Sequence, residues 1–309
     1  AEKFATLVPS EEVQKTTDDG LKVPKAQKDL IEKKQKEPFT VNTAVFNLFG
    51  AFNESQQQQL IGVTEVTSEN THADDLLSAE AANEGKLREL ALFEDFVSND
   101  IATSAAGANT PFYLNITAWV QQRMGYGNSA VNPQTSKIVR WFIASPKWES
   151  TIEFANTQQI RNFKLKVIEG FGVKSEQKLS AAVEADVASL MAEPVNAKAI
   201  AAIQQWQAGK EFDQQAVVDA VIEGGQNLHT LAALVAWARY DTALKAGAAE
   251  FTTNYMGEVD GVSNGTALNH ILYGAAATLG ALSKLLETVG IYTGSSQYRQ
   301  YNEFRSQPG

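Results

Sequence analysis

The sequence predicts a mainly α-helical protein with a small β component, and three observations lead to this fold class. Between Asp74 and Lys245, long stretches repeat their apolar residues with the three-to-four-residue period of a helix. β-Branched and aromatic residues gather only in short runs, at Phe112–Met124 and Phe251–Val259. Apolar residues make up 44% of the 309 residues and charged residues 20%, which is typical of a globular protein that buries a sizeable core.

The first forty residues are polar and rich in charged side chains, so we expect residues 1–40 to form an arm or a loosely packed extension. The basic run Lys22–Lys36 within it is either a solvated face or a contact for nucleic acid. The next segment, Pro38–Phe52, adds aromatic and aliphatic residues and should dock on the core. The glutamines Gln56–Gln59 are expected to lie on the polar surface.

Helices are predicted for most of the remaining chain. One lies within Asp74–Ile101, and another begins at Asn132 and runs through Ile143, because Asn is a favoured N-cap and Pro a favoured first helical residue. The later elements are a helical stretch with short breaks at Glu149–Gly225, an apolar helix at Leu228–Lys245, a strand at Phe251–Val259 and a long helix at Thr266–Val289. We therefore divide the chain into an arm (1–40), a helical N-terminal region (41–110) and a C-terminal domain (111–309).

The composition excludes several kinds of site. The sequence contains no cysteine, which rules out disulfides, thiolate catalysis and cysteine-bound zinc. Its three histidines, His72, His229 and His270, are scattered, so a multi-histidine metal site is not expected. No apolar run reaches about 18 residues, and the first residues lack a basic and then apolar pattern. We expect neither a membrane partner nor a secretory signal.

The charge is distributed unevenly along the chain. The net charge of −10 argues against broad, non-specific binding of nucleic acid, which depends on Lys and Arg. Between Gln121 and Ser175, however, eight Lys or Arg residues stand against three acidic residues. This local excess predicts one basic face on an otherwise acidic protein.

An aspartate follows the last predicted strand. Asp260 comes directly after Phe251–Val259, and Gly261 and the turn residues Ser263–Gly265 follow it. A carboxylate at a strand end, beside a glycine that lets the backbone approach closely, suits Mg²⁺, which binds carboxylate, carbonyl and phosphate oxygens. The alternative is a structural turn in which Asp260 only caps the following helix.

A second motif combines basic residues with a predicted helix start. Lys137 and Arg140 are three residues apart in the helix expected from Asn132, so they would share one face near its positive end. Arg123 ends the extended segment just before it. This arrangement suits a phosphate group. The alternative is a solvated basic surface on a helix that is otherwise buried.

Together the two motifs resemble the T7-type single-subunit DNA-dependent RNA polymerases. Arg123, followed by Asn-Pro-Gln at Asn132 and then by Lys137 and Arg140, is similar to the family's upstream Thr/Asp-x-x-Gly-Arg region. Asp260-Gly, followed by Ser-Asn-Gly, is similar to the family's motif A. Within the family the likeness is strongest to the polymerases of N4-type podoviruses, and it covers about residues 85–309.

The resemblance implies a partial right-hand polymerase fold, with thumb-side helices and, within residues 111–309, part of the palm. It implies that Asp260 and Gly261 bind Mg²⁺ and that Asp260 and Arg123 are catalytic. It also implies a set of residues that bind nucleotide or nucleic acid, namely Arg123, Asn132, Lys137 and Arg140.

Two parts of the family's active site have no counterpart in the sequence. The family has a finger helix with a Lys and a Tyr for the incoming nucleotide, and a His-Asp motif with the second metal-binding carboxylate, but no His-Asp dipeptide occurs here. Lys284 and Tyr292 have a finger-like spacing, yet they follow Asp260 too closely to form a separate finger. The resemblance therefore implies that a partner chain completes a two-metal site, which transfers nucleotides from NTPs to the RNA 3′ end.

The implied protein is the small subunit of a heterodimeric phage RNA polymerase, a transcription enzyme acting in the cytoplasm of the infected bacterial host. Its partners would be a second subunit carrying the finger Lys and Tyr and the second catalytic Asp, a single-stranded or open DNA template, RNA and NTPs. One alternative is a fragment of a virion-packaged phage RNA polymerase. Another, from a different class, is a non-catalytic helical interaction or scaffold protein.

Overall fold

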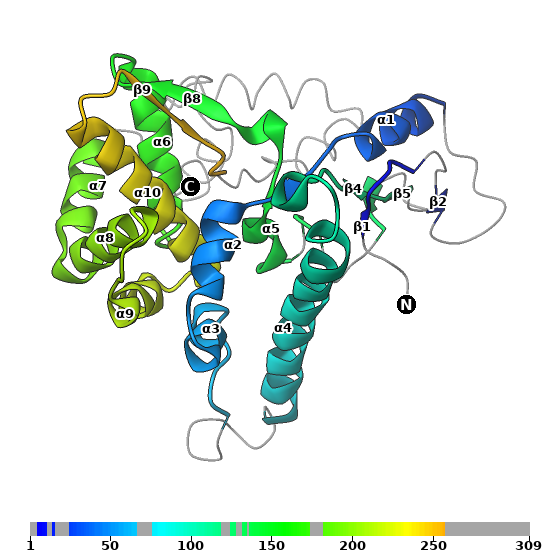
Figure 1. Cartoon of the computed structure of the whole chain (residues 1–309), viewed down its shortest axis with the longest axis horizontal. Helices are drawn as coiled ribbons and strands as arrows, with labels where there is room; N and C mark the ends of the chain where they lie inside the picture. Colours follow the sequence, from blue (N-terminus) through cyan, green and yellow to red (C-terminus); the bar gives the residue numbers. More distant parts are fainter. Residues whose placement is uncertain are drawn as a thin grey trace, which may run out of the picture.

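The computed structural model describes residues 5–10, 14–15, 25–66, 76–118, 124–127, 132–134, 136–173 and 182–256 (Figure 1). In this part of the chain, helices predominate, and the strands form one three-stranded and three two-stranded sheets. The predicted fold class, mainly α with a small β component, is confirmed. None of the described helices is long and apolar enough to cross a membrane.

The helices are α1 (Lys25–Gln35), α2 (Thr43–Gly50), α3 (Glu54–Leu60), α4 (Leu76–Phe96), the π-helix η1 (Val97–Ile101), the 3-10 helix η2 (Gly107–Asn109), α5 (Val139–Phe142), the 3-10 helix η3 (Pro146–Trp148), α6 (Thr157–Glu169), α7 (Ala182–Ala192), α8 (Pro194–Gln207), α9 (Gln214–Gly224) and α10 (Leu228–Lys245). The strands are β1 (Ala5–Thr6), β2 (Gln14–Lys15), β3 (Thr40–Val41), β4 (Tyr113–Leu114), β5 (Ile116–Ala118), β6 (Met124–Tyr126), β7 (Ile143–Ala144), β8 (Ser150–Glu153) and β9 (Glu250–Thr253).

The N-terminal segment, expected to pack loosely, is anchored at two places. Strand β1 pairs antiparallel with β4, and β2 pairs parallel with β5, which pairs in turn with β6. Helix α1 packs on β5 through the fully buried Ile31 (Figure 1). The buried Gln35 side chain donates to the carbonyl of Ser10 (3.1 Å) and accepts from the N–H of Ile116 (3.1 Å). Paired strands and a buried side-chain bridge, rather than a large apolar face, hold this segment.

Helix α1 also carries the basic run predicted at its position. Lys25 pairs with Asp29 (2.7 Å) and Lys28 with Glu32 (3.7 Å), each four residues further along the helix. All four side chains are exposed. Such pairs are typical of a solvated helix face, and they contribute only a few tenths of a kcal/mol each.

The glutamine run forms a helix, and the prediction that it lies on the polar surface is wrong for Gln56. Asn53 and Gln56 make a capping box: the Asn53 side chain accepts from the N–H of Gln56 (3.0 Å), and the Gln56 side chain accepts from the N–H of Asn53 (3.2 Å). Gln56 is buried as a result. The Asn-x-x-Gln spacing is the sequence signal for this helix start.

The C-terminal part of the described chain is a group of helices around α10. Helices α6, α8 and α9 pack on α10, and the antiparallel strands β8 and β9 lie beside them, with Ile152 opposite Phe251 (Figure 1). The prediction of an apolar helix at Leu228–Lys245 is confirmed with its bounds, since most of α10 is buried. The predicted breaks at Gly170–Gly172, Pro194 and Gly209 also separate the observed helices.

Strand β8 corrects the prediction of a helical stretch beginning at Glu149. Its β-branched residues Thr151 and Ile152 pair with β9, a partner about a hundred positions away, and the helix begins only after the N-cap Asn156. Strand β9 itself ends at Thr253 rather than continuing, because the Thr253 hydroxyl accepts from the N–H of Tyr255 (3.1 Å) and turns the chain. The predicted helix at Thr266–Val289 lies outside the described residues.

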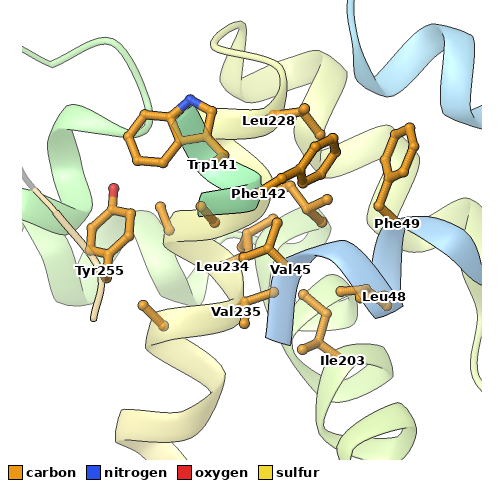
Figure 2. Close-up of a cluster of buried hydrophobic side chains, with 14 of the residues drawn as sticks. Val45, Leu48, Phe49, Trp141, Phe142, Ile203, Leu228, Leu234, Val235 and Tyr255 are labelled. Carbon is orange, nitrogen blue, oxygen red and sulfur yellow. The ribbon is translucent and has the colours of Figure 1, made fainter. Parts of the chain in front are cut away.

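One continuous hydrophobic core joins the N-terminal helices to the group of helices around α10. Figure 2 shows Val45 of α2 beside Leu234 of α10 and Leu48 of α2 beside Ile203 of α8, while Phe49 of α2 packs against Phe142 of α5 (ring centroids 5.1 Å apart). The prediction that Pro38–Phe52 docks on the core is therefore confirmed.

Helix α2 is also fixed to α5 by polar bonds at its start. Asn42 donates its side-chain amide to the carbonyl of Trp141 (3.0 Å), and its backbone N–H donates to the carbonyl of Phe142 (2.8 Å). These two bonds set the position of α5 between α2 and α10.

Candidate functional site

The residues predicted to form the site fall into two groups. Asp260, Gly261 and Arg123 lie outside the described residues, so their predicted roles remain predictions. The structure does describe Asn132, Lys137 and Arg140, and it describes the chain up to Met256, four residues before Asp260.

Residues 132–134 and 136–138 form turns and bends, and the predicted helix start at Asn132 is wrong. The buried Asn132 side chain accepts from the N–H of Gln134 (2.9 Å), and the buried Ser136 hydroxyl accepts from the N–H of Val139 (2.7 Å). Side chains of this kind compete with the helical backbone for its own N–H groups, so the helix begins only at Val139 and has four residues. Lys137 precedes it and therefore does not share a helix face with Arg140.

Arg140 points back onto these turns. Its Nε donates to the carbonyl of Ser136 (2.7 Å), and one Nη donates to the carbonyl of Gln134 (2.7 Å). The side chain is half-buried, and burial lowers the pKa of its guanidinium while the charge of Glu89 opposes that shift. Arg140 thus holds the Asn-Pro-Gln loop in shape.

Glu89 of α4 supports the same loop, a role that the sequence alone did not reveal. Its Oε1 accepts from the N–H of Val139 (3.3 Å), at the first turn of α5. Burial raises the pKa of the Glu89 carboxyl, and hydrogen bonds from the backbone of Val139 and Ile138 and the charge of Arg140 oppose the shift. The sequence signal is weak, because Glu89 is one of several acids on α4 and only the fold brings it to α5.

Lys137 lies between these supports and faces solvent. Its side chain is exposed, and its ammonium group has no ion-pair partner within the described ranges. The loop therefore presents one unpaired cation, held at the end of a hydrogen-bonded scaffold.

The predicted basic face is only partly supported. The described basic residues of this region lie on four separate parts of the chain: the turns before α5, α5 itself, the 3-10 helix η3 and helix α6. On η3, Lys147 pairs with Glu37 (2.7 Å), which also pairs with Lys34 (3.2 Å).

A stack of three rings connects α5 with the chain that leads to Asp260. Trp141 lies parallel to His229 of α10, with ring centroids 4.1 Å apart, and Tyr255 lies 6.1 Å from Trp141 and 6.0 Å from His229. Trp141 and Tyr255 are both labelled in Figure 2. The Tyr255 hydroxyl donates to the carbonyl of Lys166 on α6 (3.1 Å).

Burial determines the protonation of two of these rings. The pKa of His229 is lowered to about 4 by burial and, to a lesser degree, by the charge of Arg140. The His229 Nε2 is buried and has no hydrogen-bond partner in the described part of the chain. The pKa of the Tyr255 hydroxyl is raised well above its usual value by burial and by the charge of Glu169. At neutral pH both rings are uncharged and act as packing groups.

Gly170 allows α6 to approach α10 at this point. A Cβ on Gly170 would lie 2.5 Å from the Cβ of Ala233 and 2.9 Å from the hydroxyl oxygen of Tyr255. The Thr230 hydroxyl donates to the Gly170 carbonyl (2.7 Å). Any larger residue would push α6, α10 and Tyr255 apart.

Two hollows flank β9 and the residues that follow it. The smaller, of about 20 Å³, has Asn42, Arg140 and Tyr255 in its lining and has room for about one water molecule. The larger, of about 290 Å³, lies along the C-terminal part of α10 and β9. Arg239 lines both. The described residues contain no group of three His, Asp or Glu side chains that could hold a metal ion.

Comparison with known protein families gives two matches. Residues 26–143 match the virion DNA-directed RNA polymerase domain, and residues 160–241 match the plug insertion of virion DNA-directed RNA polymerase. A search of curated proteins found no match. The two matched segments follow one another and together cover well over half of the chain, and both matches are to parts of virion DNA-directed RNA polymerase.

The two matches support the predicted membership of a phage RNA polymerase family. The N4-type likeness and the heterodimer subunit remain predictions. In the structure the two matched segments share one core and contact each other directly. Gln214 donates to the carbonyl of Ala51 (2.7 Å), and Phe52 packs edge-on against Phe212 (centroids 5.8 Å apart).

Proposed function

We propose that the chain forms part of the catalytic centre of a phage DNA-directed RNA polymerase, which transfers nucleotides from NTPs to the RNA 3′ end by a two-metal mechanism. One observation supports the proposal: residues that follow the Asn-Pro-Gln motif lie beside residues that precede the Asp260 motif, more than a hundred positions further along the sequence. Trp141 and Tyr255, which flank those motifs, have ring centroids 6.1 Å apart. Arg140 and Tyr255 also line the same small hollow. Helix α5, which follows the Asn-Pro-Gln loop, and the chain leading to Asp260 therefore lie side by side.

In this proposal Asp260 and the carbonyl of Gly261 would hold Mg²⁺. The donor set fits, because Mg²⁺ prefers one or two carboxylates, carbonyl oxygens and substrate phosphates. When bound, the metal would neutralise charge that develops on the phosphates. The sequence departs from the family motif before Arg123, where Gln122 replaces Gly, and Arg123 is proposed to contact the nucleic-acid backbone near the reacting groups.

The basic loop would receive the triphosphate of the initiating nucleotide. Lys137 is exposed and unpaired within the described residues, so its ammonium group can contact phosphate oxygens directly. Asn132 and Arg140 would act on the loop itself, because their hydrogen bonds go to Gln134 and Ser136. In this proposal Lys137 contacts the phosphates, whereas Asn132 and Arg140 position the loop that carries Lys137.

The remaining catalytic residues, a finger Lys and Tyr and a second Asp, would come from another segment or another chain. Both family matches carry the description of a virion polymerase, and this supports the alternative of a virion-packaged enzyme over the small subunit of a heterodimer. The DNA template would be single-stranded or open, and the enzyme would act in the cytoplasm of the infected host.

Reconstitution tests this proposal. The purified 309-residue chain should make no RNA on a single-stranded template with Mg²⁺ and NTPs, and it should become active when combined with the polymerase segment that carries the finger and the second Asp. Templated synthesis by the chain alone would contradict the need for a partner. Inactivity in the presence of every stoichiometric partner purified with it from the native source would instead favour the non-catalytic scaffold.

A further inference from the structure

The larger hollow beside β9 has a lining suited to a phosphate group. It has a volume of about 290 Å³, close to the lower limit for ligand pockets. The polar residues in its lining are Arg239, Thr242, Thr252 and Gln207, and the Thr252 hydroxyl also contacts the hydroxyl of Thr151 on β8 (3.4 Å). No carboxylate side chain is among the described residues that line it. One cationic residue and three neutral polar residues therefore line the same space.

Arg239 is the cation that is free to bind a ligand there. Its side chain is exposed, and it has no hydrogen-bond or ion-pair partner in the described part of the chain. The nearest acid along α10, Asp241, is already engaged, since it accepts from Lys245 (2.6 Å) and from Gln204 (2.8 Å). An exposed guanidinium without a carboxylate partner is well suited to bind phosphate.

The hollow adjoins the smaller hollow that Arg140 and Tyr255 line, because Arg239 belongs to both linings. Thr252 belongs to β9, which runs beside α10 (Figure 1). A strand of nucleic acid that lies along β9 and α10 would therefore pass Arg239.

We propose that this hollow binds a phosphodiester of a nucleic-acid strand and that Arg239 is the residue contacting it. The inference rests on the proposed function and adds a strand contact to it. A phosphodiester carries a single negative charge, which one guanidinium can balance, whereas a triphosphate carries several. Phe251, the aromatic residue in the lining, is 7% exposed and offers no free face on which a base could stack. The contact is therefore to the backbone and independent of sequence.

Fluorescence anisotropy of labelled single-stranded DNA and RNA oligonucleotides, titrated with the full chain, tests the inference. Arg239→Ala should weaken binding about three- to tenfold and reduce the slope of log affinity against log salt by about 0.7. Lys245→Ala removes an exposed cation that is already paired on the same helix, so it should leave both quantities within about twofold of the wild type.

Unchanged affinity and salt slope in Arg239→Ala would overturn the inference, and so would a wild-type chain that binds no oligonucleotide. A nucleoside triphosphate with Mg²⁺ serves as a second probe, and loss of its binding in Arg239→Ala, with strand binding intact, would overturn the choice of a strand. Oligonucleotide binding is measured without RNA synthesis. A failure of the proposed enzymatic function can therefore be distinguished from a failure of this inference.

Discussion

The rings of Trp141 and His229 lie face to face, with centroids 4.1 Å apart and an angle of 17° between their planes. This contact joins the loop of basic residues on one side of the candidate site to α10, the helix that carries Arg239. It also places an ionisable ring in a buried position beside the charge of Arg140. The contact therefore bears on both the stability and the activity of the protein.

The first consequence is a loss of stability in mild acid. The pKa of His229 is lowered from 6.5 to about 4 in the folded protein, so the unfolded chain binds a proton that the folded chain resists. This contribution to the free energy of unfolding should be complete above pH 6.5 and should fall by up to about 3 kcal/mol as the pH approaches 4. Chemical denaturation at several pH values measures it. His229→Phe keeps a ring against Trp141 but cannot titrate, so the same pH dependence in this variant would contradict the assignment.

A second prediction concerns the close approach of α6 and α10. Gly170→Ala places a methyl group 2.5 Å from the Cβ of Ala233, so it should destabilise the protein by about 1–3 kcal/mol. Gly85→Ala is the matched control, because a Cβ added to Gly85, within α4, would have nothing within 4 Å of it, and this change should stabilise by about 0.5–1 kcal/mol. Thermal or urea denaturation of both variants decides the point. Equal effects would mean that the approach at Gly170 is not tight.

A third prediction separates the two ends of the Tyr255 side chain. Tyr255→Phe removes only the hydrogen bond to Lys166, at a cost of about 1 kcal/mol. Tyr255→Ala also removes the packed ring, at a cost of about 3–5 kcal/mol, and it should reduce RNA synthesis in the assembled polymerase because Tyr255 precedes Asp260 closely. Denaturation and initial rates provide the two readouts. If the alanine variant folds and keeps full activity, the stack does not position the catalytic segment.

A fourth prediction distinguishes contact from positioning in the basic loop. Lys137→Ala should leave stability within about 0.5 kcal/mol and raise the concentration of initiating nucleotide that is needed, with less effect on extension of a primer. Arg140→Ala should lower stability by about 1.5–3 kcal/mol, because its guanidinium holds the carbonyls of Ser136 and Gln134. Lys210→Ala, at an exposed position after α8, serves as the control. Similar effects of the Lys137 and Arg140 substitutions on both quantities would argue against separate roles.

The sequence predicted the parts of the fold that depend on continuous burial. The helix Leu228–Lys245 was predicted with its observed bounds, since apolar residues run through its whole length. The helix expected from Asn132 was not observed, because Asn132 and Ser136 both offer side-chain acceptors to nearby N–H groups. No local pattern distinguishes a cap that starts a helix from one that delays it.

Long-range partners explain what the sequence did not reveal at the candidate site. Strand β8 depends on β9, and Glu89 supports α5 only because α4 folds against it. In the sequence, Arg239 is indistinguishable from any other exposed arginine of a helix. Only the fold shows that β9 lies beside it and completes the lining of a hollow. The local motifs, in contrast, were sufficient to indicate a phage RNA polymerase, which the family matches support.

The role of Asp260 is the central claim, and the initial rate of templated RNA synthesis by the assembled polymerase tests it most directly. Asp260→Asn removes the charge that Mg²⁺ requires but keeps the size of the side chain. Asp219→Asn, the same change on the exposed surface of α9, is the control. We expect Asp260→Asn to lower the rate at least about a hundredfold, with folding and assembly intact, while Asp219→Asn stays near the wild type. A rate for Asp260→Asn close to that of the wild type would contradict a catalytic role for this carboxylate.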